Sequence, residues 1–303
     1  MSIKKKVIFY INALIRRGYW YNNVAFRDCR KFWKYNTFNT DVMNIGSSSS
    51  VCAFNYDGLP IKGVNFGISA NPQCADMAVL KNYFSFLNPN KSTVIIALCP
   101  FTALSGSYEY LQDRYYTILT PPVMPVFYFW KKQEVKTMMR NPLPYYPLVA
   151  LFSDLWHIIR KSSKVPTEDQ MIKDADIKMK NWLFEFSLQS LSSPLSLVNK
   201  DNIEDAIRLL NETILFCKEH NIRPVIVIPP MYHTLSEKFS KQDRHLLFDS
   251  LFDNIEDKSV QILNYMDDSN FSNNRELFKD SFLLNEKGAK IFTKIILGKL
   301  DLI

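Results

Sequence analysis

"TVIIAL" at residues 93–98 is the stretch that most directly indicates the fold. It is a continuous apolar run of strand length, rich in β-branched residues and without polar alternation. Strands of this kind are buried on both faces, as in a parallel sheet that helices cover on both sides. Four further runs bounded by turn residues indicate the other strands: "DVMNIG" (41–46), "GVNFG" (63–67), "PVIVIP" (224–229) and "VQILNYM" (260–266).

Segments with helical periodicity lie between most of these runs, and three of them begin at side chains suited to capping. Asp76 precedes one helix, Asp201 and Glu204 form a capping-box pair at the next, and Asn285 precedes the last. Strands that alternate with helices indicate βαβ units. The sequence therefore predicts an α/β fold, a three-layer α/β/α sandwich around a five-stranded parallel sheet.

Two regions depart from this alternation. Residues 105–198, approximately, lack a strong strand and are rich in aromatic residues and proline, which predicts a helical insertion in a domain spanning 41–303. Residues 1–40 form a separate arm with nine Lys and Arg, one Asp and many aromatic side chains. That mixture suits an anionic membrane surface or a phosphate-bearing partner, and an arm packed on the main domain is an equal alternative. Nucleic acid is disfavoured, because no nucleic-acid-binding module follows the arm.

Cysteine usage and the N-terminal run bear on localisation. The five cysteines are widely spaced with no CxxC pair, which indicates neither a metal site nor a disulfide framework, and we expect no cofactor. The run "VIFYINALI" (7–15) resembles the start of a signal peptide but is short and is followed by Arg16 and Arg17. No run reaches the roughly 18 apolar residues of a spanning helix. We therefore expect a cytoplasmic protein, with peripheral membrane association as a further option.

A tract of four serines, residues 47–50, directly follows the first predicted strand and Gly46. Such a tract is commonly a flexible linker. Ligands of open parallel sheets, however, bind outside the carboxyl ends of the strands, where this tract lies. Because the tract separates two strands of one unit rather than two domains, a functional serine at the sheet edge is the better interpretation.

This serine tract, "NFGIS" (65–69) and "DSFLLNEKGAK" (280–290) together resemble motifs of the SGNH (GDSL-type) hydrolase and acyltransferase superfamily. The resemblance is greatest to the polysaccharide-associated branch that includes D-alanyl-transfer proteins, and it covers roughly 41–104 and 200–303. It implies a flavodoxin-like fold and a Ser, His, Asp triad. It also implies an esterase or O-acyltransferase that acts on a glycan or its precursor, with an acylated glycan or small ester as the bound partner.

The resemblance assigns a role to several residues. Ser48 is the nucleophile, and Asp280 is the triad aspartate. The backbone N–H groups of Ser48 and Ala70 form the oxyanion hole, and Asn65 and Asn285 contact substrate. The family also offers an Asn side chain after the third strand, which this sequence lacks. The nearest alternatives there are Cys99 and Thr102.

The position of the triad histidine is occupied by Leu283, which cannot accept a proton from a serine. A serine hydroxyl without a base is a poor nucleophile. Of the four histidines, His233 follows the fourth predicted strand at the functional edge, where it is a candidate base, substrate contact or structural residue. The other three are interpreted as packing or helix-surface residues: His157, His220 and His245. Two hypotheses follow, an acyl-ester enzyme and a catalytically lapsed protein of the same fold that binds a glycan or a partner.

Overall fold

The structure is a computed structural model that describes residues 2–105, 112–121, 127–159 and 165–303. The chain forms two compact units, here called unit 1 (1–36 and 109–163) and unit 2 (37–108 and 164–303). The N-terminal arm and the insertion were expected as separate parts, whereas packing joins most of the arm to the first half of the insertion. Three pieces of the expected insertion lie outside the described residues: 106–111, 122–126 and 160–164.

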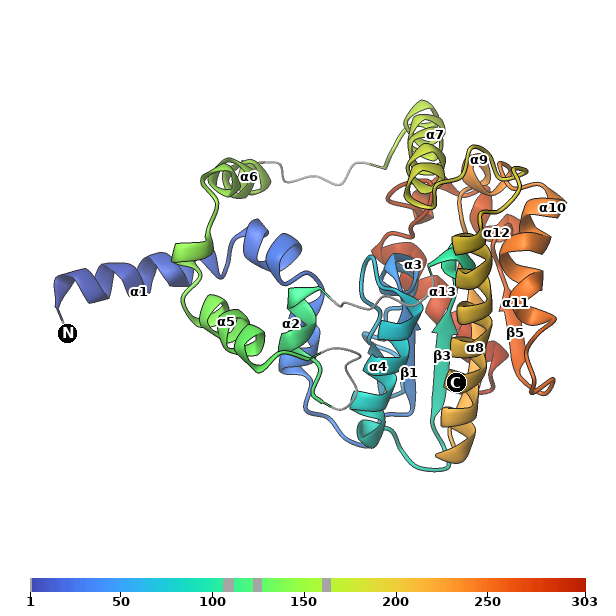
Figure 1. The fold of residues 1–303 in the computed structure, drawn as a ribbon, viewed down its shortest axis with the longest axis horizontal. Coiled ribbons are helices and arrows are strands. Elements are labelled where there is room, and N and C mark those ends of the chain that lie inside the picture. The colour runs from blue at the N-terminus through green and yellow to red at the C-terminus, as the bar shows by residue number, and fades with distance from the viewer. Residues whose placement is uncertain (1, 106–111, 122–126, 160–164) are drawn as a thin grey trace. The chain divides into compact units, whose positions relative to one another are not determined.

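Unit 2 contains a five-stranded sheet in which every pairing is parallel (Figure 1). The strand order β2-β1-β3-β4-β5 is the doubly wound order of flavodoxin. The predicted fold class is therefore confirmed, and each strand coincides with one predicted apolar run. The strands are β1 (Val42–Gly46), β2 (Gly63–Asn65), β3 (Thr93–Ala97), β4 (Arg223–Ile228) and β5 (Gln261–Asn264).

The central strands lack polar alternation because both faces of the sheet are covered. Every residue of β1 and of β3 is buried. Alternate side chains of a strand enter opposite layers, and Val42, Ile95 and Val225 share one core cluster with Phe292. Two helix pairs form the outer layers (Figure 1): α3 (Ser48–Ala53) with α13 (Glu286–Lys299), and α4 (Gln73–Tyr83) with α8 (Leu197–Glu219).

Helix starts agree less well with the sequence than strands do. The last helix begins as predicted, because the Asn285 side chain accepts a hydrogen bond from the first turn of α13. The predicted capping box of Asp201 and Glu204 is wrong. α8 begins four residues before Asp201, where the Ser196 hydroxyl accepts a 3.1 Å hydrogen bond from the N–H of Asn199.

The remaining helices are shorter or belong to unit 1. Unit 2 adds α7 (Glu168–Glu185), α9 (His233–Ser236), α10 (Lys241–Arg244), α11 (Ser250–Phe252) and α12 (Ser269–Ser272). Unit 1 contains α1 (Ile3–Ile15), α2 (Cys29–Lys34), α5 (Phe129–Arg140) and α6 (Leu148–Ile159). Short 3₁₀ or π segments are Tyr21–Ala25, Phe84–Phe86, Thr102–Leu104, Asp113–Thr117, Leu143–Tyr145, His245–Asp249 and Arg275–Leu277. Within the described ranges, every helix is too short or too polar to traverse a bilayer.

Candidate functional site

The serine tract is a strand–turn–helix junction. β1 ends at Gly46, and Ser48 is the first residue of α3. Ser49 and Ser50 are buried, and the Ser50 hydroxyl donates a 2.9 Å hydrogen bond to the carbonyl oxygen of Ile45. These contacts exclude the flexible-linker alternative. Ser48 itself is half-buried at the carboxyl end of a central strand, where open parallel sheets bind ligands.

The turn before Ser48 requires glycine. Gly46 has φ +131°, and a Cβ atom there would lie 2.4 Å from the carbonyl oxygen of Ala97. No side chain fits this approach between neighbouring strands. Gly46 therefore fixes the direction in which the chain leaves β1, and with it the position of Ser48.

The Ser48 hydroxyl lies beside the backbone of Ala70. The Ala70 N–H donates a 3.3 Å hydrogen bond to Ser48 Oγ, which has no other hydrogen bond in the part of the chain that the structure describes. Ala70 adopts φ +53°, a left-handed conformation that costs a non-glycine residue about 1–2 kcal/mol. The N–H of Ser48, at the first position of α3, has no partner within the helix. The N–H groups of Ser48 and Ala70 are the two expected to form an oxyanion hole. One belongs to the serine itself, and the other donates to the serine hydroxyl.

Asp280 stabilises a tight turn. Its Oδ1 accepts 2.9 Å hydrogen bonds from the N–H groups of Phe282 and Leu283, and lies 3.6 Å from Lys178 Nζ. Leu283 packs partly buried against an apolar cluster that includes Phe282. The carboxylate therefore faces backbone donors and a lysine ammonium, and the side chain at the histidine position is part of the hydrophobic packing.

Helix α7 holds this turn through one of its faces. Asp174 Oδ2 accepts hydrogen bonds from the N–H (2.9 Å) and the hydroxyl (2.6 Å) of Ser281, and Asp174 Oδ1 lies 3.5 Å from Lys178 Nζ. On the other side of the turn, Lys279 Nζ donates a 3.1 Å hydrogen bond to Cys52 Sγ. Cys52 lies one helical turn after Ser48 in α3. The structure thus brings the helix that begins at Ser48 into contact with the turn of the last motif.

His233 has partners other than the serine. It begins α9, with Nε2 3.4 Å from Glu168 Oε1 and Nδ1 3.6 Å from Glu237 Oε1, and its ring packs on Tyr232 with centroids 4.4 Å apart. Over the described residues no histidine is hydrogen-bonded to Ser48. The other three contact the Tyr19 ring (His157), the Phe216 carbonyl oxygen (His220) and the Asp249 carboxylate (His245).

The two asparagines predicted to contact substrate are engaged in the fold. Asn65 Nδ2 lies within hydrogen-bond distance of three carbonyl oxygens of α3 and its C-terminal end, and Asn65 Oδ1 accepts from Asn44 and Gly67. Asn285 caps α13 through Oδ1, and its Nδ2 donates to two carbonyl oxygens of the preceding turn. These contacts occupy both ends of each amide and give both asparagines a structural role, and their contact with substrate stays a prediction.

Asp76 is a site residue that sequence reasoning interpreted only as a helix cap. It lies inside the first turn of α4, is 8% exposed, and its Oδ1 accepts hydrogen bonds from Asn71 Nδ2 and from the N–H of Gly46 at 3.1 Å. Burial raises the pKa of Asp76 to about 8, while the hydrogen bonds from Asn71 and Gly46 oppose that rise. Its setting in "CADMAVL", an acid inside an apolar run, was the signal for a buried carboxyl.

Cys99 and Thr102, the nearest alternatives to the asparagine side chain that the resembled family offers, contact each other within one turn. Thr102 Oγ1 accepts a 3.0 Å hydrogen bond from the N–H of Cys99 and also contacts Cys99 Sγ at 3.4 Å, so its hydroxyl is engaged in its own turn. Cys99 Sγ lies 3.9 Å from Ser47 Oγ. Burial raises the pKa of the Cys99 thiol, which keeps it protonated at neutral pH.

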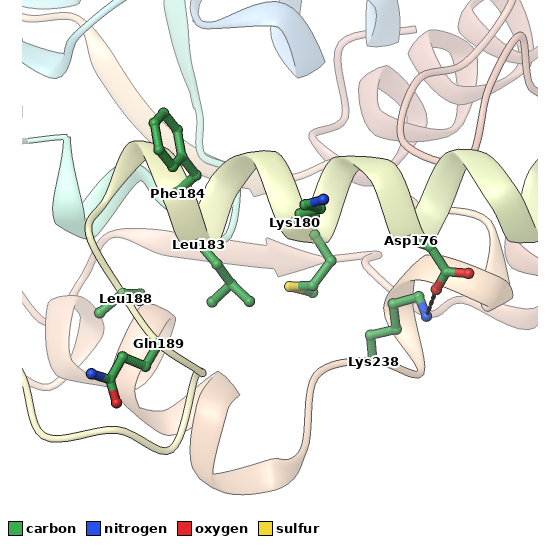
Figure 2. Close-up of a pocket in the computed structure, with 8 residues that line it drawn as sticks. Asp176, Lys180, Leu183, Phe184, Leu188, Gln189 and Lys238 are labelled. Carbon is green, nitrogen blue, oxygen red and sulfur yellow. Dashed lines mark hydrogen bonds and ion pairs between the residues drawn. The ribbon is translucent and has the colours of Figure 1, made fainter.

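A groove of about 470 Å³ runs along the other face of α7 (Figure 2). Leu183 points toward Leu188 and Gln189, and Phe184, the next residue of the helix, also lines the groove. At the far end, Lys238 Nζ pairs with Asp176 Oδ1 at 2.5 Å. Helical spacing places these groove residues away from Asp174 and Lys178, which hold the turn. A smaller hollow of about 290 Å³ lies between the end of α7 and the start of α8. Neither is lined by Ser48.

Comparison with known proteins leaves the site to be interpreted from its own chemistry. No protein-family model matches the chain, and no curated protein sequence matches it. Among the described side chains, no group of three or more His, Cys, Asp or Glu is arranged to hold a metal ion.

Proposed function

We propose that this chain is an SGNH-like protein whose serine site has lost efficient catalysis and binds an O-acylated glycan or a related ester. The support is the resemblance of three motifs, the α/β/α sandwich, and the position of Ser48 at the carboxyl end of β1. The carbonyl oxygen of a bound ester would accept a hydrogen bond from the N–H of Ala70, which now donates to Ser48 Oγ.

The observation that carries the proposal is the environment of Ser48 Oγ. Its one hydrogen bond within the described chain comes from a backbone donor, and no imidazole or carboxylate accepts its proton. Loss of the base from a Ser, His, Asp triad costs on the order of 10⁶ in turnover in subtilisin. A site with this arrangement favours binding of an ester over its cleavage.

The surroundings of Asp280 support the same conclusion. In a triad the aspartate orients the histidine and stabilises the imidazolium that forms. Here Asp280 is paired with the Lys178 ammonium, and Leu283 contributes apolar packing instead of an imidazole. Lys178 Nζ lies 3.5 Å from Asp174 Oδ1 and 3.6 Å from Asp280 Oδ1, so the positive charge that faces Asp280 is a lysine ammonium and not an imidazolium.

A weak esterase or O-acyltransferase acting on a glycan or its precursor is the second candidate. It is favoured by the 3.3 Å distance from the Ala70 N–H to Ser48 Oγ. A donor that close to the nucleophile is suited to stabilising the oxyanion of an acyl-transfer intermediate. The two candidates differ in whether Ser48 turns an ester over, which an assay measures directly.

Hydrolysis of p-nitrophenyl acetate tests the proposal. We expect the native chain and Ser48→Ala to hydrolyse it at the same rate, because no base activates Ser48. Leu283→His should raise the rate by about 10²–10⁴, the usual contribution of a positioned general base. The gain should be larger when Lys178→Met is added, because Asp280 is then free to orient the imidazole.

Two control variants complete this assay. Leu283→His combined with Ser48→Ala should return to the native rate, and Leu215→His, on the exposed face of α8, should show only the background of a surface imidazole. Native activity that disappears in Ser48→Ala would establish the second candidate. The binding half of the proposal is checked by calorimetric titration with an O-acetylated methyl glycoside. Equal affinity for the deacetylated glycoside, or unchanged affinity in Ser48→Leu, contradicts it.

A further inference from the structure

Unit 1 differs from unit 2 in charge. Unit 1 contains sixteen Lys and Arg against five Asp and Glu, a formal charge of +11, whereas unit 2 sums to −4. The positive charge therefore belongs to unit 1, a compact unit assembled from residues 1–36 and 109–163. An anionic partner is attracted to unit 1 and not to unit 2.

Helix α1 presents an apolar stripe to solvent. Its inward face contains Asn12, whose amide pairs with Asn141 and with the backbone of Leu143. The opposite face contains apolar residues at helical spacing, and Leu14 is 67% exposed. The exposed stripe consists of Ile3, Val7, Tyr10, Ile11 and Leu14. The face of α1 that packs inside unit 1 thus contains Asn12 and Ile15, and a stripe of apolar side chains faces outward.

Helix α6 also presents an apolar stripe to solvent. Asp154 faces inward, accepting hydrogen bonds from the Trp20 N–H at 2.7 Å and the Tyr146 hydroxyl at 2.8 Å, and His157 stacks on the Tyr19 ring. The outward residues again follow helical spacing, with Leu148 85% and Phe152 74% exposed. The full exposed stripe is Leu148, Val149, Leu151, Phe152, Leu155 and Trp156.

Basic residues border the α1 stripe. At 100° per residue, Lys4 and Lys6 lie on either side of Ile3 and Val7, and neither lysine forms an ion pair in the described part of the chain. Long basic side chains of this kind extend to phosphate groups while neighbouring apolar residues enter the acyl boundary. Interfacial membrane helices combine these two features.

We propose that unit 1 binds the surface of an anionic phospholipid bilayer through the outward stripes of α1 and α6 and the lysines of α1. A second copy of the chain is a poorer occupant of this surface, because two units of +11 repel each other. A nucleic acid matches the charge and leaves the apolar stripes unexplained. This proposal is independent of Ser48, so its test and the esterase assay succeed or fail separately.

Vesicle co-sedimentation of the full chain tests the proposal. The native chain should pellet with vesicles of phosphatidylcholine and phosphatidylglycerol at 70:30, and far less with phosphatidylcholine alone. Raising the salt to 0.5 M should weaken binding to the mixed vesicles, because exposed charges are then screened within a few ångströms.

Two double variants separate charge from apolar contact. Lys4→Gln with Lys6→Gln should reduce partitioning about 25-fold, at about fivefold for each lysine near an anionic surface. Leu148→Ser with Phe152→Ser should reduce it at least about tenfold, because two large side chains no longer enter the acyl boundary. All four positions are exposed, so circular dichroism should show native folding and thermal stability.

The matched controls are the same kinds of change on unit 2. Leu215→Ser and Lys294→Gln alter an exposed apolar residue and an exposed lysine there, and both should bind mixed vesicles like the native chain. A native chain that stays in the supernatant overturns the proposal, whether it is monomeric or self-associated by light scattering. Equal binding to neutral vesicles, or equal losses in the control variants, overturns it as well.

Discussion

Asp76 shows how one buried acid can be retained beside the turn that positions Ser48. Both of its hydrogen bonds are accepted by Oδ1, from Asn71 and from Gly46. A carboxyl group whose pKa is raised to about 8 by burial is neutral at pH 7 and carries its proton on the other oxygen. The neutral form avoids the large cost of burying an unpaired charge. It also leaves Oδ1 as a carbonyl acceptor that anchors the N–H of Gly46.

The stability of Asp76→Asn should depend less on pH than that of the native chain. Between about pH 4 and pH 8 the native carboxyl keeps its proton, whereas the unfolded chain, with a pKa of 3.8, has lost it. The native state therefore binds more protons, and this group lowers the free energy of unfolding as pH rises through that window. An amide keeps the Oδ1 acceptor and removes the titration. Urea denaturation at pH 5, 6, 7 and 8 measures the slope.

Asp57→Asn is the control for this prediction, because Asp57 is exposed on a loop of the same unit. It should keep the native pH dependence. An Asp76→Asn chain whose stability still falls with pH as steeply as the native chain would show that Asp76 is ionised in the folded state.

The strand–turn–helix element around Gly46 was the part of the site most accessible to sequence reasoning. The apolar run of β1, a glycine and a serine at the sheet edge together predicted where Ser48 lies. Most of the supporting contacts were not predictable, because Asn65 bonds to Asn44 and α3, and Asp76 to Gly46, across 11 to 30 positions of sequence. Helix starts were also ambiguous locally: Asp76 and Asp201 have the chemistry of caps, and only the fold shows that α4 and α8 begin earlier.

Gly46→Ala should destabilise the chain by about 2–4 kcal/mol, the sum of backbone strain and a steric clash. A Cβ at Gly46 lies 2.4 Å from the Ala97 carbonyl oxygen, on a strand that cannot shift without breaking the sheet. Gly58→Ala is the matched control, because Gly58 also has a positive φ, +81°, and no atom within 4 Å of the added Cβ. It should lose only about 1 kcal/mol of backbone strain. Guanidinium denaturation of both variants isolates the clash, and equal losses would contradict it.

At the scale of the whole molecule, sequence patterns separated the arm, the insertion and the sheet domain, and did not predict unit 1. Local periodicity identifies helices one at a time. The contacts that make unit 1 join residues more than a hundred positions apart, such as the Asn12 amide to Asn141 and the Tyr21 hydroxyl to the Met139 carbonyl oxygen. Contacts between residues so far apart in the sequence leave no pattern in the spacing of apolar residues along either segment.

The two units should unfold as separate cooperative bodies, since each has its own core. Ile95 is fully buried in β3 of unit 2, and Phe26 is 2% exposed in unit 1. Each residue changed to alanine should cost about 3 kcal/mol of local stability through the lost packing and the cavity left behind. Native-state hydrogen exchange by mass spectrometry reports which amides lose protection. Ile95→Ala should speed exchange about 150-fold in peptides of unit 2 and leave unit 1 at its native rate, and Phe26→Ala should do the reverse. Loss of protection in both units from either single change would show that they form one cooperative body, because destabilising one core would then open the other.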